Sequence, residues 1–287
     1  MFERPEAPSP DDLTVVVVSL VGGAALEACL TALARQADRI VVVGRGASDT
    51  ADDAKTTVPM LRMKALVAAR TPYVAFIEDT AVPGADWRRG LSAAFAMDGT
   101  AAVAGPITIS PSLSSRGLAL GLSEYARFSP NEMKQDPASG LPGLAFAVAR
   151  DAVLPLLDDQ TGGLIEGDLF RRLKETGKTV RTSDAMSVCY AAEHEQGARL
   201  RTRFQHGRLF AGRRFPKALL VRRLGHAAGC LLLPAAMIHR ALRDRPQRLN
   251  VWPGAVLWLC LLSTAWSAGE FTGYLTGSVG DAAESWT

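Results

Sequence analysis

Two adjacent carboxylates, Glu78 and Asp79, follow an apolar run from Tyr73 to Ile77. A run of β-branched and aromatic residues of this kind predicts a strand that is buried on both faces. Open α/β sheets bind their ligands beyond the carboxyl ends of strands. Carboxylates there can hold a divalent cation, and the cation can neutralise a diphosphate leaving group. The alternative interpretation is an ordinary strand end with two solvated acids.

A second group of carboxylates, Glu166 and Asp168, opens a predicted helix that runs to about Thr176 and ends before Gly177. Carboxylates in the first turn of a helix interact favourably with its dipole, so helix capping alone would account for them. The functional alternative is that Glu166 acts as a general base.

The segments that must position these carboxylates predict a parallel sheet. An apolar run at 13–20 and another at 39–43 predict two strands, and apolar residues spaced by three and four over 24–36 predict a helix between them. A strand, a helix and a strand within about thirty residues form a right-handed crossover unit. Further strands are predicted at 101–104 and 144–148, and further helices at 60–69, 85–97 and 151–157.

Two segments permit more than one interpretation. Gly44-Arg45-Gly46 follows the second strand, where a glycine-bearing loop can approach a nucleotide or form an ordinary turn. Residues 107–139 contain a possible helix at 118–128. The Ser, Pro and Gly residues on either side of it favour a long loop that could close over a substrate.

The composition is that of a globular protein: 287 residues, 48% of them hydrophobic and 21% charged. The first twelve residues lack an apolar stretch, so we expect a disordered lead-in at 1–12 and no signal peptide. The four cysteines are far apart and form no Cys-x-x-Cys pair, which favours a reducing cytosol. No P-loop, nucleophile elbow or two-histidine zinc motif is present, and several enzyme classes are thereby excluded.

Positive charge is concentrated in one segment. Residues 199–248 contain twelve arginines and one lysine against one acid, Asp244, in a chain whose net charge is only +3. Such a segment can face nucleic acid, an anionic membrane or anionic substrates. Because long apolar runs interrupt it, a membrane is favoured and no nucleic-acid partner is expected.

Two apolar segments accompany this positive charge. Leu224–Ile238 is short for a membrane span and contains His226 and Pro234. Arginines flank it on both sides, so the positive-inside rule predicts that it lies in the membrane interface or re-enters. Val251–Gly269 carries no charge and is the better candidate to cross the membrane, or it lies against the surface. The alternative is that both segments are core helices of a soluble domain.

These motifs resemble those of the family-2 glycosyltransferases, which have a nucleotide-sugar-binding α/β fold. The resemblance covers about residues 13–215, and four motifs occur in the family's order. They are Leu26, Leu30, Leu33 and Gln36; Arg62 with Glu78-Asp79, Pro83 and Trp87; Glu166 with Asp168-Leu169, Arg172-Leu173 and Gly177; and His194 with Gly207-Arg208.

The resemblance implies a GT-A-like fold, a mixed and mainly parallel sheet flanked by helices, with C-terminal apolar helices after it. The implied domains are a glycosyltransferase domain at 13–215 and a basic, apolar, membrane-associated helical region at 216–287. The nucleotide-sugar-binding residues that it implies are Ser19, Arg45, Arg62, Glu78, Asp79 and Arg208. For Arg208, a basic surface helix at the membrane is the alternative.

The resemblance also implies a mechanism. A Mg or Mn ion bound by Glu78, Asp79 and His194 would stabilise the departing diphosphate. Glu166, with Asp168 as the second catalytic residue, would deprotonate an acceptor hydroxyl and invert the anomeric centre. His194 has the alternative of an ordinary surface or core position.

Three departures from the family pattern affect these expectations. In one of them, the acidic pair before the helix is reduced to Glu166, with Ile165 before it. Gly44 and Arg45 stand where the family usually carries acidic residues that bind the base, and Thr80 replaces the commonest final Asp of the metal motif.

The first hypothesis is an inverting glycosyltransferase at the inner membrane with its catalytic domain in the cytoplasm. It would use a nucleotide-sugar donor and a lipid-linked or envelope polysaccharide acceptor. The second is a catalytically degenerate relative that binds a nucleotide or acts as a scaffold in polysaccharide assembly.

Overall fold

The computed structural model describes residues 12–44, 56–135, 140–157, 163–193, 199–214, 220–243 and 252–278. The chain forms two compact units. The first unit comprises Met1–Thr108 and Phe128–Ala192, and the second comprises Ile109–Arg127 and Glu193–Trp286. This division differs from the predicted domain boundary at 215, because helix α8 (Leu200–Arg214) packs in the second unit, against the C-terminal helix α11 (Trp252–Thr276).

The first unit is built on a six-stranded sheet in the order β2-β1-β3-β7-β5-β8. Its strands are β1 (Leu13–Ser19), β2 (Ile40–Gly44), β3 (Tyr73–Glu78), β5 (Thr100–Ala104), β7 (Ala145–Ala149) and β8 (Thr179–Thr182). Strand β7 runs antiparallel to both of its neighbours, and the other pairs are parallel. The predicted fold class, a mixed and mainly parallel sheet flanked by helices, is confirmed.

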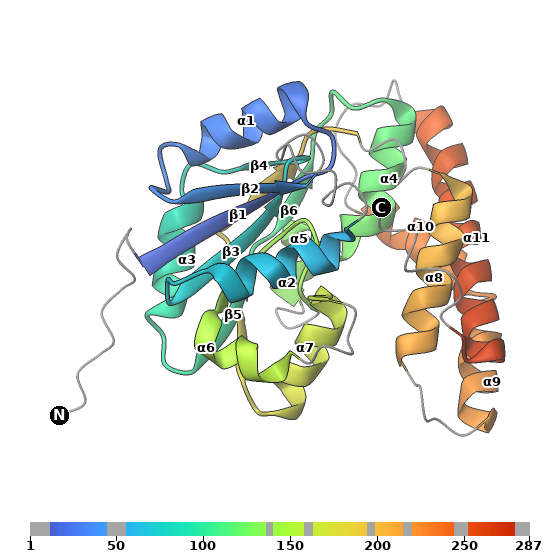
Figure 1. The fold of residues 1–287 in the computed structure, drawn as a ribbon. Helices are drawn as coiled ribbons and strands as arrows, with labels where there is room; N and C mark the ends of the chain where they lie inside the picture. Colours follow the sequence, from blue (N-terminus) through green and yellow to red (C-terminus); the bar gives the residue numbers. More distant parts are fainter. Residues whose placement is uncertain are drawn as a thin grey trace. The chain divides into compact units, whose positions relative to one another are not determined.

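The apolar runs in the sequence became the central strands because both faces of the sheet are covered. Every residue of β1 is buried, and β3 is buried from Val74 to Ile77. The helices of this unit are arranged around the sheet in Figure 1. They are α1 (Gly23–Leu33), α2 (Val58–Ala68), α3 (Trp87–Phe95), α5 (Pro130–Gln135), α6 (Arg150–Val153), the 3-10 turn η4 (Leu154–Leu156) and α7 (Glu166–Glu175).

A second sheet of three short strands lies in the order β4-β9-β6. It consists of β4 (Ala81–Pro83), β9 (Val188–Tyr190) and β6 (Ile107–Ile109). The sequence did not predict these strands, since three-residue strands carry no periodic pattern. The sequence left 107–139 ambiguous between a helix at 118–128 and a long loop, and the helix is found in the described part. That part contains β6, α4 (Ser115–Tyr125), the 3-10 turn η3 (Ala126–Phe128) and α5.

The second unit is helical in its described part. It contains α4, α8, α9 (Leu220–Gly229), α10 (Leu233–Arg243) and α11. Helix α11 is long and apolar enough to cross a membrane, although a core helix of a soluble protein has the same properties. Glycines allow it to lie directly on α8, because a Cβ at Gly269 would meet the Phe204 carbonyl oxygen at 1.9 Å and one at Gly207 would meet the Trp266 carbonyl oxygen at 2.2 Å.

Candidate functional site

The first feature of the site is the carboxylate of Asp79, which follows β3 and is 1% exposed. Strands β1 and β3 are parallel neighbours with Val18 opposite Glu78, so Asp79 lies beside the end of β1. Its carboxylate accepts hydrogen bonds from the Ser19 hydroxyl (3.0 Å) and from the backbone amides of Leu20 (3.0 Å), Val21 (3.0 Å) and Gly22 (2.7 Å).

These amides lead into α1, whose N-cap is Gly22. The first amides of a helix lack partners within the helix and attract an anion. Asp79 is therefore the anion that the start of α1 holds. Ser19 and Asp79 are hydrogen-bonded to each other, and their predicted contact with a nucleotide sugar stays a prediction.

The second feature is Arg62, a guanidinium on α2 that is 1% exposed. Its Nη2 donates to Glu78 Oε1 (2.9 Å) and to the Gly143 carbonyl (2.6 Å), and its Nη1 donates to Glu166 Oε2 (3.1 Å). The guanidinium also lies 5.6 Å from the centroid of the Phe146 ring. One buried cation therefore joins two carboxylates from β3 and α7, which are far apart in the sequence.

Glu166, the first residue of α7, keeps part of its carboxylate accessible. Its side chain is 21% exposed. Within the described residues, only Oε2 takes part in a hydrogen bond, the one from Arg62. Oε1 faces Gly143, where an added Cβ would lie 3.1 Å away. The site thus presents one carboxylate oxygen that is fixed by a cation and another that can accept a proton.

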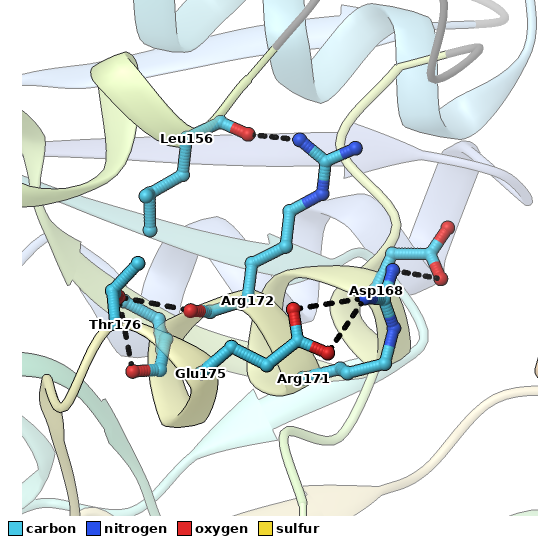
Figure 2. A network of polar contacts seen from close by, with 7 residues as sticks. Leu156, Asp168, Arg171, Arg172, Glu175 and Thr176 are labelled. Atoms are coloured by element: carbon cyan, nitrogen blue, oxygen red, sulfur yellow. Dashed lines mark hydrogen bonds and ion pairs between the residues drawn. The ribbon is translucent and has the colours of Figure 1, made fainter.

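Asp168 is placed differently from Glu166. Figure 2 shows Arg171 between Asp168 and Glu175 on the surface of α7. Arg171 contacts Glu175 at 3.0 Å and Asp168 at 3.7 Å. Arg172 on the same helix donates to the Leu156 carbonyl and so holds α7 against η4. These contacts favour a structural role for Asp168, whose predicted catalytic role stays a prediction.

Two of the three predicted metal ligands, Glu78 and Asp79, are already bound within the protein. Asp79 is hydrogen-bonded to the start of α1, and Glu78 is paired with Arg62. Thr80 is buried, and in the described part of the chain its hydroxyl has no hydrogen-bond partner. No group of three or more His, Cys, Asp or Glu side chains that could hold a metal occurs among the described residues. His194 lies outside them.

The glycine loop after β2 has a structural explanation in part. Gly44 has φ +112°, and a Cβ there would lie 2.6 Å from the Ser19 carbonyl oxygen. Glycine is therefore required for β2 to approach β1, whether or not a nucleotide binds. Arg45 lies outside the described residues, so its predicted contact with a nucleotide stays a prediction.

Arg208 belongs to the second unit, on α8, where its Nη2 lies 3.4 Å from the Ser278 hydroxyl. Its predicted contact with the nucleotide sugar is not tested by this arrangement.

Asp79 also affects Cys29, a fully buried residue of α1. Burial, together with the nearby negative charge of Asp79, raises the pKa of the Cys29 thiol to about 12. A thiol in this state is a packing group and not a nucleophile. The sequence did not predict that Cys29 lies near the site. Its helical spacing indicates that it is buried, but it does not indicate which strand end lies beside it.

Comparisons with known proteins give structural matches only. Neither a protein-family model nor a curated protein sequence matches this chain. Among solved structures, the chain is similar to a mannosyltransferase from Pyrobaculum calidifontis in complex with GDP-Man and Mn2+. The identity is 15%, the match covers 96% of this chain and 78% of the other, and the TM-score is 0.42. Similarity at this level assigns no residue, ligand or activity to this chain.

Proposed function

We propose that this chain transfers a sugar from a nucleotide-diphosphate donor to a hydroxyl of a lipid-linked or envelope polysaccharide acceptor, at the cytoplasmic face of the inner membrane. The observation that carries the proposal is the Arg62 bridge between Glu78 and Glu166. It gathers residues from two of the motifs that resemble family-2 glycosyltransferases at the carboxyl end of a central parallel strand, where α/β sheets bind their ligands.

Glu166 is the proposed general base. Arg62 holds Oε2, while Oε1 is able to take a proton from an acceptor hydroxyl. The deprotonated hydroxyl then attacks the anomeric carbon from the face opposite the diphosphate, the carbon–oxygen bond to the diphosphate breaks, and the configuration inverts. Arg62 is a positioning residue, because it is buried and its bonds to the carboxylates fix the direction of Glu166.

No step of this proposal passes through a divalent cation at Glu78 and Asp79, because both side chains are bound within the protein. The same observation favours a second candidate function. A degenerate relative that binds a nucleotide or acts as a scaffold would retain the fold and lack turnover.

Turnover of a panel of nucleotide sugars by the purified protein tests the proposal. Release of nucleoside diphosphate would be measured with and without manganese, magnesium and a chelator, so that the predicted cation is tested separately from Glu166. We expect turnover with one donor and its loss in Glu166→Gln. The matched control is Glu175→Gln, which changes an exposed carboxylate on the same helix and should leave turnover unchanged.

The two candidates give different outcomes. Turnover that survives in Glu166→Gln would reject the base assignment. No turnover with any donor, in the presence of extracted membrane lipid as acceptor and with nucleotide binding intact, would favour the second candidate.

A further inference from the structure

Helix α9 and the turn that follows it place apolar side chains toward solvent in an unusual way. On α9, Val221 (81% exposed), Leu224 (46% exposed) and Ala228 recur at helical spacing on one exposed face. The turn that follows adds Leu231 (77% exposed) and Leu232 (75% exposed). A helix on a soluble surface normally directs this face inward. A contiguous exposed patch of this kind marks an interaction surface.

The exposed leucines are attached to a backbone that is fixed. Cys230, which precedes them, is 3% exposed and packs in a cluster with Ala227, Ala211 and Tyr274. The turn is closed by backbone hydrogen bonds from Leu231 to Ala228 (3.2 Å) and from Leu232 to Gly229 (3.1 Å). The leucines therefore project from an ordered turn.

Helix α11 holds this turn in place. Pro234 has no amide hydrogen to offer the carbonyl of Cys230, four residues earlier. That carbonyl accepts hydrogen bonds from the Leu233 amide (3.3 Å) and from the Ser267 hydroxyl of α11. Arg223 of α9 donates to the carbonyls of Tyr274 (2.8 Å) and Leu275 (2.8 Å) at the end of α11. The orientation of the leucines is thus set by α11 and does not depend on a partner.

The charged side chains of α9 and α10 themselves are of one sign. Residues 220–243 contain four arginines and two histidines and no acidic residue. Arg222 on α9, and Arg240 and Arg243 on α10, are exposed. Apolar side chains that enter acyl chains, with arginines beside them at headgroup depth, are the arrangement of an interfacial membrane helix. A protein partner would need an acidic surface around an apolar pocket. An anionic leaflet has negatively charged headgroups above an apolar interior at every point of its surface.

We propose that α9, α10 and the turn Cys230–Leu232 dock on the anionic leaflet of a bilayer, with Leu231 and Leu232 inserted among the acyl chains and the arginines at the headgroups. This surface deepens the membrane association in the proposed function, but it rests on the second unit alone and not on sugar transfer.

Vesicle co-sedimentation of the full-length protein tests this surface without any donor or acceptor. One set of vesicles contains phosphatidylcholine alone, and the other contains phosphatidylcholine with phosphatidylglycerol. We expect binding to the anionic vesicles, weakened by salt, and at least a roughly tenfold loss of affinity in the double variant Leu231→Ser/Leu232→Ser. A second variant, Arg240→Gln/Arg243→Gln, should lose the preference for anionic vesicles and keep the leucine contribution.

The matched control is Val67→Ser/Met97→Ser, which changes two exposed apolar residues of the first unit (59% and 50% exposed) and should bind as the wild type does. Equal binding by the leucine variant and the wild type would overturn the proposal. So would equal binding of the wild type to both kinds of vesicle. A dimer in solution that the leucine variant abolishes, with no vesicle binding, would instead assign the patch to a second copy of this chain. Absence of turnover in the sugar-transfer assay would not affect a positive vesicle-binding result, because the vesicle test uses neither donor nor acceptor.

Discussion

At the scale of single residues, Arg62 is the feature on which the candidate site depends. It is buried and contacts two carboxylates that are themselves largely covered, Glu78 (13% exposed) and Glu166 (21% exposed). A buried cation with two carboxylate partners is costly to remove, because the carboxylates lose their counter-charge in a site with limited access to water.

The variant Arg62→Met should therefore lower the free energy of unfolding by roughly 3–5 kcal/mol, measured by urea denaturation. The control is Arg89→Met, which removes an arginine that is 75% exposed and paired with Asp86. That change should cost under about 1 kcal/mol. Equal effects of the two changes would mean that the Arg62 bridge does not contribute to the fold.

Glu270 is a second residue whose environment has a measurable consequence. It is 6% exposed and accepts a hydrogen bond from the Trp266 indole. Burial raises the pKa of its carboxyl above the ordinary value of 4.5, against the smaller opposing effects of the Trp266 hydrogen bond and the charge of Arg214. The folded state therefore binds this proton more tightly than the unfolded state does.

It follows that the contribution of Glu270 to stability falls as pH rises from 4.5 through the raised pKa. The variant Glu270→Gln keeps an acceptor for Trp266 and removes the titration. We expect it to be more stable than the wild type at neutral pH and to lose this advantage below pH 4.5, measured as melting temperature against pH. Parallel pH profiles for the two proteins would contradict this prediction.

At the scale of elements, the contact between α8 and α11 depends on glycines. A Cβ at Gly269 would lie 1.9 Å from the carbonyl oxygen of Phe204, a backbone atom that cannot rotate away. The variant Gly269→Ala must separate the helices, and we expect a loss of about 1–3 kcal/mol or more in thermal or urea unfolding.

Gly225 on α9 gives the matched control, since nothing lies within 4 Å of the position where its Cβ would be. Gly225→Ala should be neutral or stabilise the protein by up to about 1 kcal/mol, because alanine has the higher helix propensity. A destabilisation of the same size in both variants would show that the α8–α11 contact is not the cause.

The sequence predicted elements where a single chain segment contains the whole pattern. The strand at 73–77 and the helix that Glu166 opens were found because burial on both faces and helical spacing are local properties. The strands β4, β6 and β9 were missed, because pairing between distant three-residue segments leaves no local signal. Residues of the site followed the same rule. Arg62, Glu78 and Glu166 were identified as candidates, but their shared bridge depends on how the elements pack.

Asp79 is another residue whose contacts depend on how distant elements pack and could not be predicted from the local sequence. The residue type and its position at the end of a strand indicated a metal ligand. The register of β1 with β3 instead places Asp79 at the start of α1, where three backbone amides and a hydroxyl bind it. A sequence pattern states which ligands a carboxylate could bind, and the neighbouring backbone decides which one it does bind.

At the scale of the whole molecule, the question is how α11 relates to a membrane. Along its length α11 packs on helices that carry arginines. Arg203 of α8 is 3% exposed, lies over the Trp266 ring at 4.7 Å and is paired with Glu124, and Arg223 binds the last carbonyls of α11. If α11 crossed a bilayer as part of this unit, the Arg203 guanidinium beside Trp266 would enter the hydrocarbon with it. A charge at the centre of a bilayer costs about 2.5–3.5 kcal/mol.

We therefore expect the protein to be held at one leaflet, with α11 as the core helix of the second unit. Alkaline carbonate extraction of membranes that contain the full-length protein should release it into the supernatant, while a membrane-spanning marker protein stays in the pellet. Release should be easier for Leu231→Ser/Leu232→Ser than for the wild type, because the inserted side chains are then lost. Retention of the wild type with the marker would mean that α11 separates from α8 and spans the bilayer. In that case Gly269→Ala, which weakens the α8–α11 contact, should increase the retained fraction.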